Sequence, residues 1–230
     1  MARWELQASA DIPGDGGELR LYRRADEFSL RLVGLGELMT SRTHGSEDAL
    51  GKLVCENLAA TRNAQVLIGG LGMGFTLAAA LAELGPDATA EVAELVPEVI
   101  TWNEGPLGAC AGYPAGDPRA RVHQGDVGEV LAAADQHYDA VLLDVDNGPE
   151  GMTRRANDRL YAYDGLIDAY QALKPGGTLA VWSASPDKPF LGRLQKTGFD
   201  VVERRVRAHG SKGSRHIIWF AKRPARDARR

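Results

Sequence analysis

Polar and apolar residues alternate along two short segments near the N-terminus. The segments are residues 18–22 and 28–32, and a Pro-Gly-Asp-Gly-Gly run precedes the first of them. Alternation with a period of two is typical of strands that bury one face. Turn-forming residues also separate the two segments. We therefore predict a small antiparallel β-meander over residues 1–45.

The next stretch has the spacing of an amphipathic helix. Ser46 is suited to cap such a helix, and Glu47 and Asp48 follow in its first turn, where they favour the helix dipole. Apolar residues then recur at helical spacing, namely Leu50, Leu53, Val54 and Leu58. The pattern predicts a helix from Ser46 to about Arg62.

From residue 65 onward, apolar runs bounded by turns alternate with helical stretches, which indicates βαβ units around a parallel sheet. The predicted strands cover residues 65–68, 89–95, 120–123, 138–143 and 177–182. A helix near 190–197 precedes two more β-like runs, 199–204 and 216–220, whose spacing predicts an antiparallel pair. We therefore predict an α/β fold with a doubly wound, mostly parallel sheet of methyltransferase type. It would span residues 46–224, end in an antiparallel hairpin and be followed by a basic tail at 225–230.

Composition narrows the classes of function. The chain has 230 residues, of which 44% are hydrophobic and 25% charged, as in an ordinary globular domain. A formal net charge of -4 gives no general attraction to nucleic acid or to anionic membranes, so we expect neither as a partner. Cys55 and Cys110 belong to no metal-ligand pattern, and no metal is expected. With no signal segment or long apolar run, we predict a cytoplasmic protein.

A glycine-rich turn carries the strongest chemical signal. The predicted strand 65–68 leads into Gly69-Gly70-Leu71-Gly72-Met73-Gly74, a helix begins near Phe75, and Glu94 ends the following strand. Glycines allow a ligand to approach the backbone, and the helix N-terminus offers free N–H donors. A carboxylate at the next strand end is placed to accept hydrogen bonds from two ribose hydroxyls. The alternatives are a plain tight turn with a solvated Glu94, or a phosphate-bearing dinucleotide.

Two further aspartates follow predicted strands. Asp126 follows the third strand, where a carboxylate would accept a hydrogen bond from the amino group of adenine, or would act only as a turn residue. Asp144 ends the fourth strand, at the sheet edge where such folds present reactive groups. Together with the glycine turn, these positions favour a nucleoside ligand.

Several segments in succession resemble the spermidine synthases, which are aminopropyltransferases. The segments are Ile68-Gly69-Gly70, the run AELVPEVI at 93–100, Asp117-Pro118-Arg119, Gln124-Gly125-Asp126-Val127 and YDAVLLD at 138–144, with His44-Gly45-Ser46-Glu47 upstream. The resemblance covers most of the chain. It implies S-adenosylmethionine or its decarboxylated form as co-substrate, and a homodimer active in polyamine biosynthesis.

The resemblance also implies roles for individual residues. Glu94 would hold the ribose, Asp126 the adenine and Asp144 the incoming amine, and Val127 would also belong to the co-substrate site. The glycines Gly69, Gly70, Gly72 and Gly74 would complete the nucleoside site. An acidic lining for the amine would comprise Asp144, Glu47, Asp146 and Glu150, with Asn147 and Tyr161 beside it. Exposed loop charge is the alternative for Asp146 and Glu150, and core packing is the alternative for Tyr161. Trp182 and Trp219 are expected to be packing residues.

The sequence departs from the family at two places. Spermidine synthases usually carry an aspartate in a G-G-G-D-G-G turn, where this chain has Gly72. Their loop after the fourth strand typically reads D-S-S-D-P, where this chain has Asp144-Val145-Asp146-Asn147-Gly148-Pro149. Three functions therefore stay open: aminopropyl transfer to an amine, methyl transfer from S-adenosylmethionine to a small molecule, and nucleoside binding without catalysis.

Overall fold

The computed structural model describes residues 2–14, 16–145, 159–209 and 212–225. Its first part is a four-stranded antiparallel sheet in which consecutive strands pair. The strands are β1 (Glu5–Asp11), β2 (Glu18–Arg24), β3 (Glu27–Leu32) and β4 (Gly36–Thr40). Leu19, Leu21 and Leu30 alternate with more exposed residues and are almost fully buried, so the sheet has one apolar face. The predicted meander is confirmed, with strands on either side of the two that alternation indicates.

The second part is a seven-stranded sheet in the order β10-β11-β9-β8-β5-β6-β7. Strands β5 to β9 run parallel, and β10 and β11 form the antiparallel end that the sequence predicts. The strands are β5 (Gln65–Gly69), β6 (Thr89–Glu94), β7 (Ala120–Gln124), β8 (Tyr138–Leu143), β9 (Leu173–Ser183), β10 (Asp200–His209) and β11 (Lys212–Lys222). The α/β fold of methyltransferase type is thereby confirmed.

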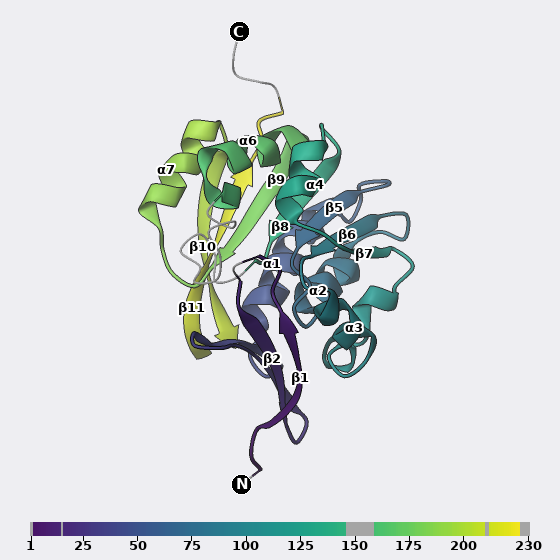
Figure 1. The fold of residues 1–230 in the computed structure, drawn as a ribbon. Coiled ribbons are helices and arrows are strands. Elements are labelled where there is room, and N and C mark those ends of the chain that lie inside the picture. Colours follow the sequence, from purple (N-terminus) through teal and green to yellow (C-terminus); the bar gives the residue numbers. More distant parts are fainter. Residues whose placement is uncertain (1, 15, 146–158, 210–211, 226–230) are drawn as a thin grey trace.

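Helices cover both faces of this sheet (Figure 1). Val66 and Ile68 of β5 pack in one core with α1 (Gly45–Cys55), α2 (Phe75–Glu83) and α3 (Pro97–Glu104). Leu67, between them, packs in a second core with α4 (Val127–Ala133), α6 (Tyr163–Ala172) and α7 (Lys188–Thr197). Because side chains of a strand alternate between its faces, a continuous apolar run is what a strand buried on both sides requires.

The helix predicted to reach about Arg62 is shorter. It ends at Cys55 and tightens into a 3-10 turn, η1 (Glu56–Leu58). Leu58 is the last side chain packed against the core, and the following residues are mostly exposed. A helix is maintained mainly by burial of an apolar face, so it ends where that face ends. Further 3-10 turns, η2 (Gly108–Ala111) and η3 (Pro114–Gly116), precede β7.

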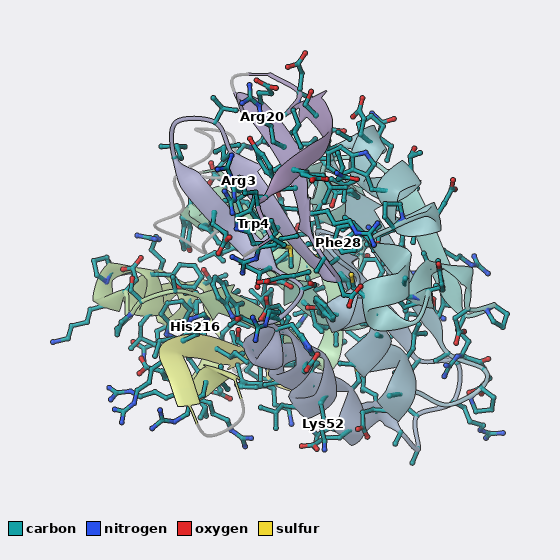
Figure 2. The ribbon with its side chains drawn as sticks, turned by 90° about the horizontal axis from the view of Figure 1, so that it is seen from below. Arg3, Trp4, Arg20, Phe28, Lys52 and His216 are labelled. Carbon is teal, nitrogen blue, oxygen red and sulfur yellow. The ribbon has the colours of Figure 1, made fainter. Side chains whose placement is uncertain are left out.

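The N-terminal sheet lies at the end of the molecule where the parallel strands of the large sheet finish (Figure 1). Figure 2 looks from that side, with the N-terminal strands, α1 and the β10–β11 hairpin nearest the viewer. This arrangement brings the apolar face of the small sheet over the carboxyl ends of the parallel strands, which is where ligands bind in open α/β sheets. Within the described part of the chain, no helix is both long and apolar enough to cross a membrane.

Candidate functional site

A cavity of about 440 Å³ lies between the two sheets, within the range usual for small-molecule sites. One half is formed by the carboxyl ends of β5, β6, β7 and β8 and the loops that follow them. The other half is formed by the N-terminal sheet, the start of α1 and the ends of β9 and β11. Predicted site residues that line it are Glu47, Gly70, Gly72, Glu94, Asp126, Val127 and Asp144.

The glycine turn has the backbone conformation that only glycine adopts readily. Gly70, Gly72 and Gly74 have φ values of 88°, 52° and 83°. A Cβ atom on Gly70 would lie 2.7 Å from the carbonyl oxygen of Asp144, which no ordinary side chain tolerates. Gly70 and Gly72 line the cavity, whereas Gly69 packs against Val127 and Gly74 packs against Pro114. The turn therefore brings its backbone directly against the end of β8.

Glu94 is buried at the end of β6 and accepts two backbone hydrogen bonds. Its Oε2 accepts from the Leu71 N–H at 2.8 Å, and its Oε1 accepts from the Val96 N–H at 2.9 Å. Burial raises the pKa of Glu94, and these backbone hydrogen bonds act against that rise. Glu94 also lines the cavity, so its carboxylate can accept hydrogen bonds from a ligand there.

Asp126 caps the helix that follows β7. Its Oδ1 accepts a hydrogen bond from the Gly128 N–H at 2.8 Å, which is the usual contact of an aspartate at a helix start. The same residue lines the cavity next to Gly125 and Val127. Capping fixes its orientation and leaves its other oxygen as an acceptor, so a role toward adenine stays a prediction.

Asp144 and Glu47 form an acidic pair in the lining of the cavity. Thr76 Oγ1 donates to Asp144 Oδ2 at 2.6 Å, and Ser46 Oγ donates to Glu47 Oε2 at 2.5 Å. Burial raises the pKa of Asp144. Burial and repulsion from Asp144 raise the pKa of Glu47 to about 7. A cation bound beside two such carboxyl groups would offset both their desolvation and their mutual repulsion.

The pKa of Glu47 predicts a pH dependence of stability. Because its folded pKa lies above its ordinary value of 4.5, its protonated form contributes stability below pH 4.5, and this stability is lost as the pH rises through about 7. At about pH 8, the free energy of unfolding of Glu47→Gln is expected to exceed that of the wild type by up to about 3 kcal/mol. Below about pH 5 the difference should vanish. Urea unfolding of both proteins across this pH range measures the difference. Parallel profiles of unfolding free energy against pH would contradict the raised pKa of Glu47.

Other predicted residues do not reach the cavity or cannot be placed. Asp146, Asn147 and Glu150 lie outside the described residues. Tyr161 was expected beside the substrate, but its side chain is 2% exposed and packs edge-on against Phe190. Its hydroxyl donates to the Val145 carbonyl at 3.3 Å. The core-packing alternative therefore describes Tyr161, because the apolar face of the sheet encloses its ring.

His44 stands at the start of α1. Its Nδ1 lies 2.8 Å from Asp48 Oδ2, and its ring stacks on Phe75 with centroids 4.0 Å apart. Phe75 is the first residue of α2, which follows the glycine turn. His44 thus connects the helix that carries Glu47 to the helix that follows the glycine turn.

Sequence reasoning missed the apolar half of the cavity. Its lining comprises Ile12, Leu19, Leu30, Leu38, Met39, Trp182 and Ala184. In the sequence these residues read as ordinary strand positions, because alternation identifies a buried face without showing what that face covers. Trp182 packs in the core as expected and also lines the cavity.

No protein-family model matches the chain, and no curated protein matches it by sequence. Solved structures do match. A spermidine synthase in complex with the transition-state analogue AdoDATO has a TM-score of 0.74 at 18% identity, with 99% of this chain and 76% of that chain covered. Spermidine synthase from Thermotoga maritima has a TM-score of 0.73 at 18% identity, with 97% and 74% covered.

The chain has the spermidine synthase fold. This fold belongs to the wider class I methyltransferase type, since human methyltransferase-like protein 13 in complex with SAH also matches. That structure has a TM-score of 0.59 at 22% identity, with 79% of this chain and 82% of that chain covered. At such identities the likeness establishes a transferase fold, and the reaction has to be argued from the residues of the cavity.

Proposed function

We propose that this protein transfers an aminopropyl group from decarboxylated S-adenosylmethionine to an amine and releases methylthioadenosine. The observation that carries the proposal is the position of Asp144. It follows β8 directly, lines the same cavity as Glu94, accepts a hydrogen bond from Thr76 and lies beside Glu47. An acceptor amine enters such a site as a cation, and the carboxyl pair supplies the negative charge that binds it.

The opposite half of the cavity would hold the nucleoside. In this proposal Glu94 accepts hydrogen bonds from the ribose hydroxyls, and Asp126 accepts one from the amino group of adenine. Gly70 and Gly72 have no side chains, so the ligand can lie against their backbone. The solved relatives in complex with AdoDATO and SAH support a related nucleoside in this chain.

The reaction needs only one proton transfer and correct alignment. Asp144 takes a proton from the ammonium group, and the freed lone pair of nitrogen attacks the methylene carbon bonded to the sulfonium sulfur. The new carbon–nitrogen bond forms as the carbon–sulfur bond breaks, and its electrons neutralise the sulfur in methylthioadenosine. A carboxylate with a raised pKa is a better base than an ordinary carboxylate. Alignment of the nitrogen, carbon and sulfur atoms provides the rest of the rate acceleration.

Methyl transfer from intact S-adenosylmethionine is the second candidate. Gly72 favours it, because the residue at this turn position brings no carboxylate toward the donor. The Sδ atom of Met39 lies 3.0 Å from where a Cβ of residue 72 would be, so an uncharged thioether borders the turn. The same nucleoside contacts and the same acceptor carboxylates would serve either reaction.

Calorimetry and mass spectrometry together test the proposal. The purified protein is titrated with methylthioadenosine, decarboxylated S-adenosylmethionine, S-adenosylmethionine and NAD, and each donor is then incubated with a mixture of amines. We expect micromolar or tighter binding of the sulfonium nucleosides and a mass gain of one aminopropyl group on an amine. A methyl gain would select the second candidate, and binding without any product would select a non-catalytic role. Binding of NAD alone would overturn the nucleoside assignment.

A further inference from the structure

Thr76 lies where the glycine turn, the end of β8 and the start of α1 meet. It is the second residue of α2, two positions after Gly74 of the glycine turn, and it is 3% exposed. Its Oγ1 donates to Asp144 Oδ2 at 2.6 Å and lies 3.5 Å from the backbone carbonyl oxygen of Glu47. One hydroxyl group therefore contacts both the residue that follows β8 and the first turn of α1.

Close packing of α1 on α2 brings Glu47 to Thr76. A Cβ atom on Gly51 of α1 would lie 2.5 Å from the Thr76 carbonyl oxygen and 2.8 Å from the Ala79 Cβ, so only a residue without a side chain permits this contact. Glu47 precedes Gly51 by four residues, which places both on the same face of α1. The face of α1 that carries Glu47 is therefore held against the start of α2.

Asp144 is fixed relative to the glycine turn through both its backbone and its side chain. Its N–H donates to the Gly69 carbonyl at 3.1 Å, and its carbonyl oxygen lies against Gly70. Thr76, at the other end of the turn, holds the carboxylate through a hydrogen bond whose length is typical of a hydroxyl bound to a charged oxygen. This hydrogen bond favours the ionised form of Asp144 and so lowers its pKa, against the effect of burial.

We propose that Thr76 is a positioning residue: its hydroxyl holds Asp144 Oδ2, so that Asp144 Oδ1 takes the proton of the acceptor amine. This role rests on the proposed function, since it concerns the proton transfer at the same site. In that step an N–H bond of the ammonium group breaks and an O–H bond forms at Asp144 Oδ1, while Thr76 keeps its own proton. Because Thr76 belongs to the helix that follows the glycine turn, the base and the donor nucleoside are held by the same element, which keeps them aligned.

Replacing the hydroxyl of Thr76 with a methyl group tests this role. Thr76→Val nearly keeps the shape of the side chain, and it is expected to lower the rate at saturating amine at least about tenfold while methylthioadenosine affinity changes less than about twofold. Thr76→Ser restores the hydroxyl and should recover the rate to within about threefold of wild type. The rates are measured by mass spectrometry of the aminopropylated products, with decarboxylated S-adenosylmethionine and increasing concentrations of a mixture of hexylamine and 1,4-diaminobutane. Calorimetry measures the affinity for methylthioadenosine.

A double substitution shows whether Thr76 acts through Asp144. In the Asp144→Asn background, Thr76→Val is expected to change the residual rate by less than about twofold, because the proton acceptor is already absent. The matched control is Thr101→Val, which makes the same chemical change at an exposed position of α3 outside the cavity. It should leave the wild-type rate unchanged.

Several outcomes would overturn the positioning role while the proposed function stands. They are an unchanged rate in Thr76→Val, no recovery in Thr76→Ser, and an equal loss of rate in the Asp144→Asn background. A parallel loss of rate and methylthioadenosine affinity in Thr76→Val would also overturn it, since that result would show a purely structural contribution. If the wild type forms no aminopropylated amine, the proposed function falls, and the role of Thr76 in it falls as well.

Discussion

Replacing Asp144 with asparagine is expected to lower the turnover rate about 1000-fold while leaving methylthioadenosine affinity largely unchanged. Asparagine keeps the shape of the side chain and still accepts the Thr76 hydroxyl through its Oδ1, but it cannot take a proton from the amine. The nucleoside contacts lie in the other half of the cavity. Single-turnover assays with saturating donor and amine, together with calorimetry, separate the two quantities.

The same substitution should also stabilise the fold. Asp144 is a buried carboxyl beside Glu47, and its raised pKa reports that the folded environment disfavours its charge. Removing that charge is expected to increase the free energy of unfolding by about 1 kcal/mol near neutral pH. Asp164→Asn, in the exposed first turn of α6, is the matched control and should change neither activity nor stability appreciably. Retained turnover in Asp144→Asn would show that another group accepts the proton.

Replacing Glu94 with glutamine is expected to weaken methylthioadenosine binding about 100-fold and to destabilise the fold by about 2 kcal/mol. A glutamine amide has one acceptor and one donor end. Its NH₂ group must therefore face the N–H of either Leu71 or Val96, and one buried donor loses its partner. In the proposed complex, the ribose would also lose one carboxylate oxygen as an acceptor.

Calorimetry and thermal unfolding measure these two losses for Glu94→Gln. The control is Glu98→Gln, in the exposed first turn of α3, where the same chemical change touches no part of the cavity. Wild-type nucleoside affinity in Glu94→Gln would place the ligand elsewhere. Loss of affinity without loss of stability would mean that the backbone hydrogen bonds of Glu94 contribute little to the glycine turn.

Much of the large sheet could be predicted from the sequence, because its strands are buried on both faces and leave unbroken apolar runs. Val66, Leu67 and Ile68 are each fully buried, and a short run of this kind between turns is typical of a central strand. The outer strands of the small sheet were harder. β1 is mostly exposed, so tertiary pairing with β2, more than an apolar pattern, defines it.

The candidate site likewise has one part that the sequence predicts and one part that it does not. The glycine turn, Glu94 and Asp144 were predictable because backbone geometry at strand ends restricts which residues suit those positions. The apolar lining was not, because Leu30 and Met39 reach the cavity only through packing of one sheet over another. Tyr161 shows the converse: its position in the chain suggested a ligand contact, and the surrounding core encloses it.

The contact between Gly70 and the carbonyl oxygen of Asp144 fixes the geometry between the two halves of the cavity. Main-chain atoms touch there, so the distance from the nucleoside turn to the reactive strand end cannot be adjusted by changing a side chain. The N-terminal sheet, in contrast, contributes separate lining residues such as Leu19 and Leu30. Substitutions in that sheet can therefore reshape the cavity, while the reach from the glycine turn to the end of β8 stays constant.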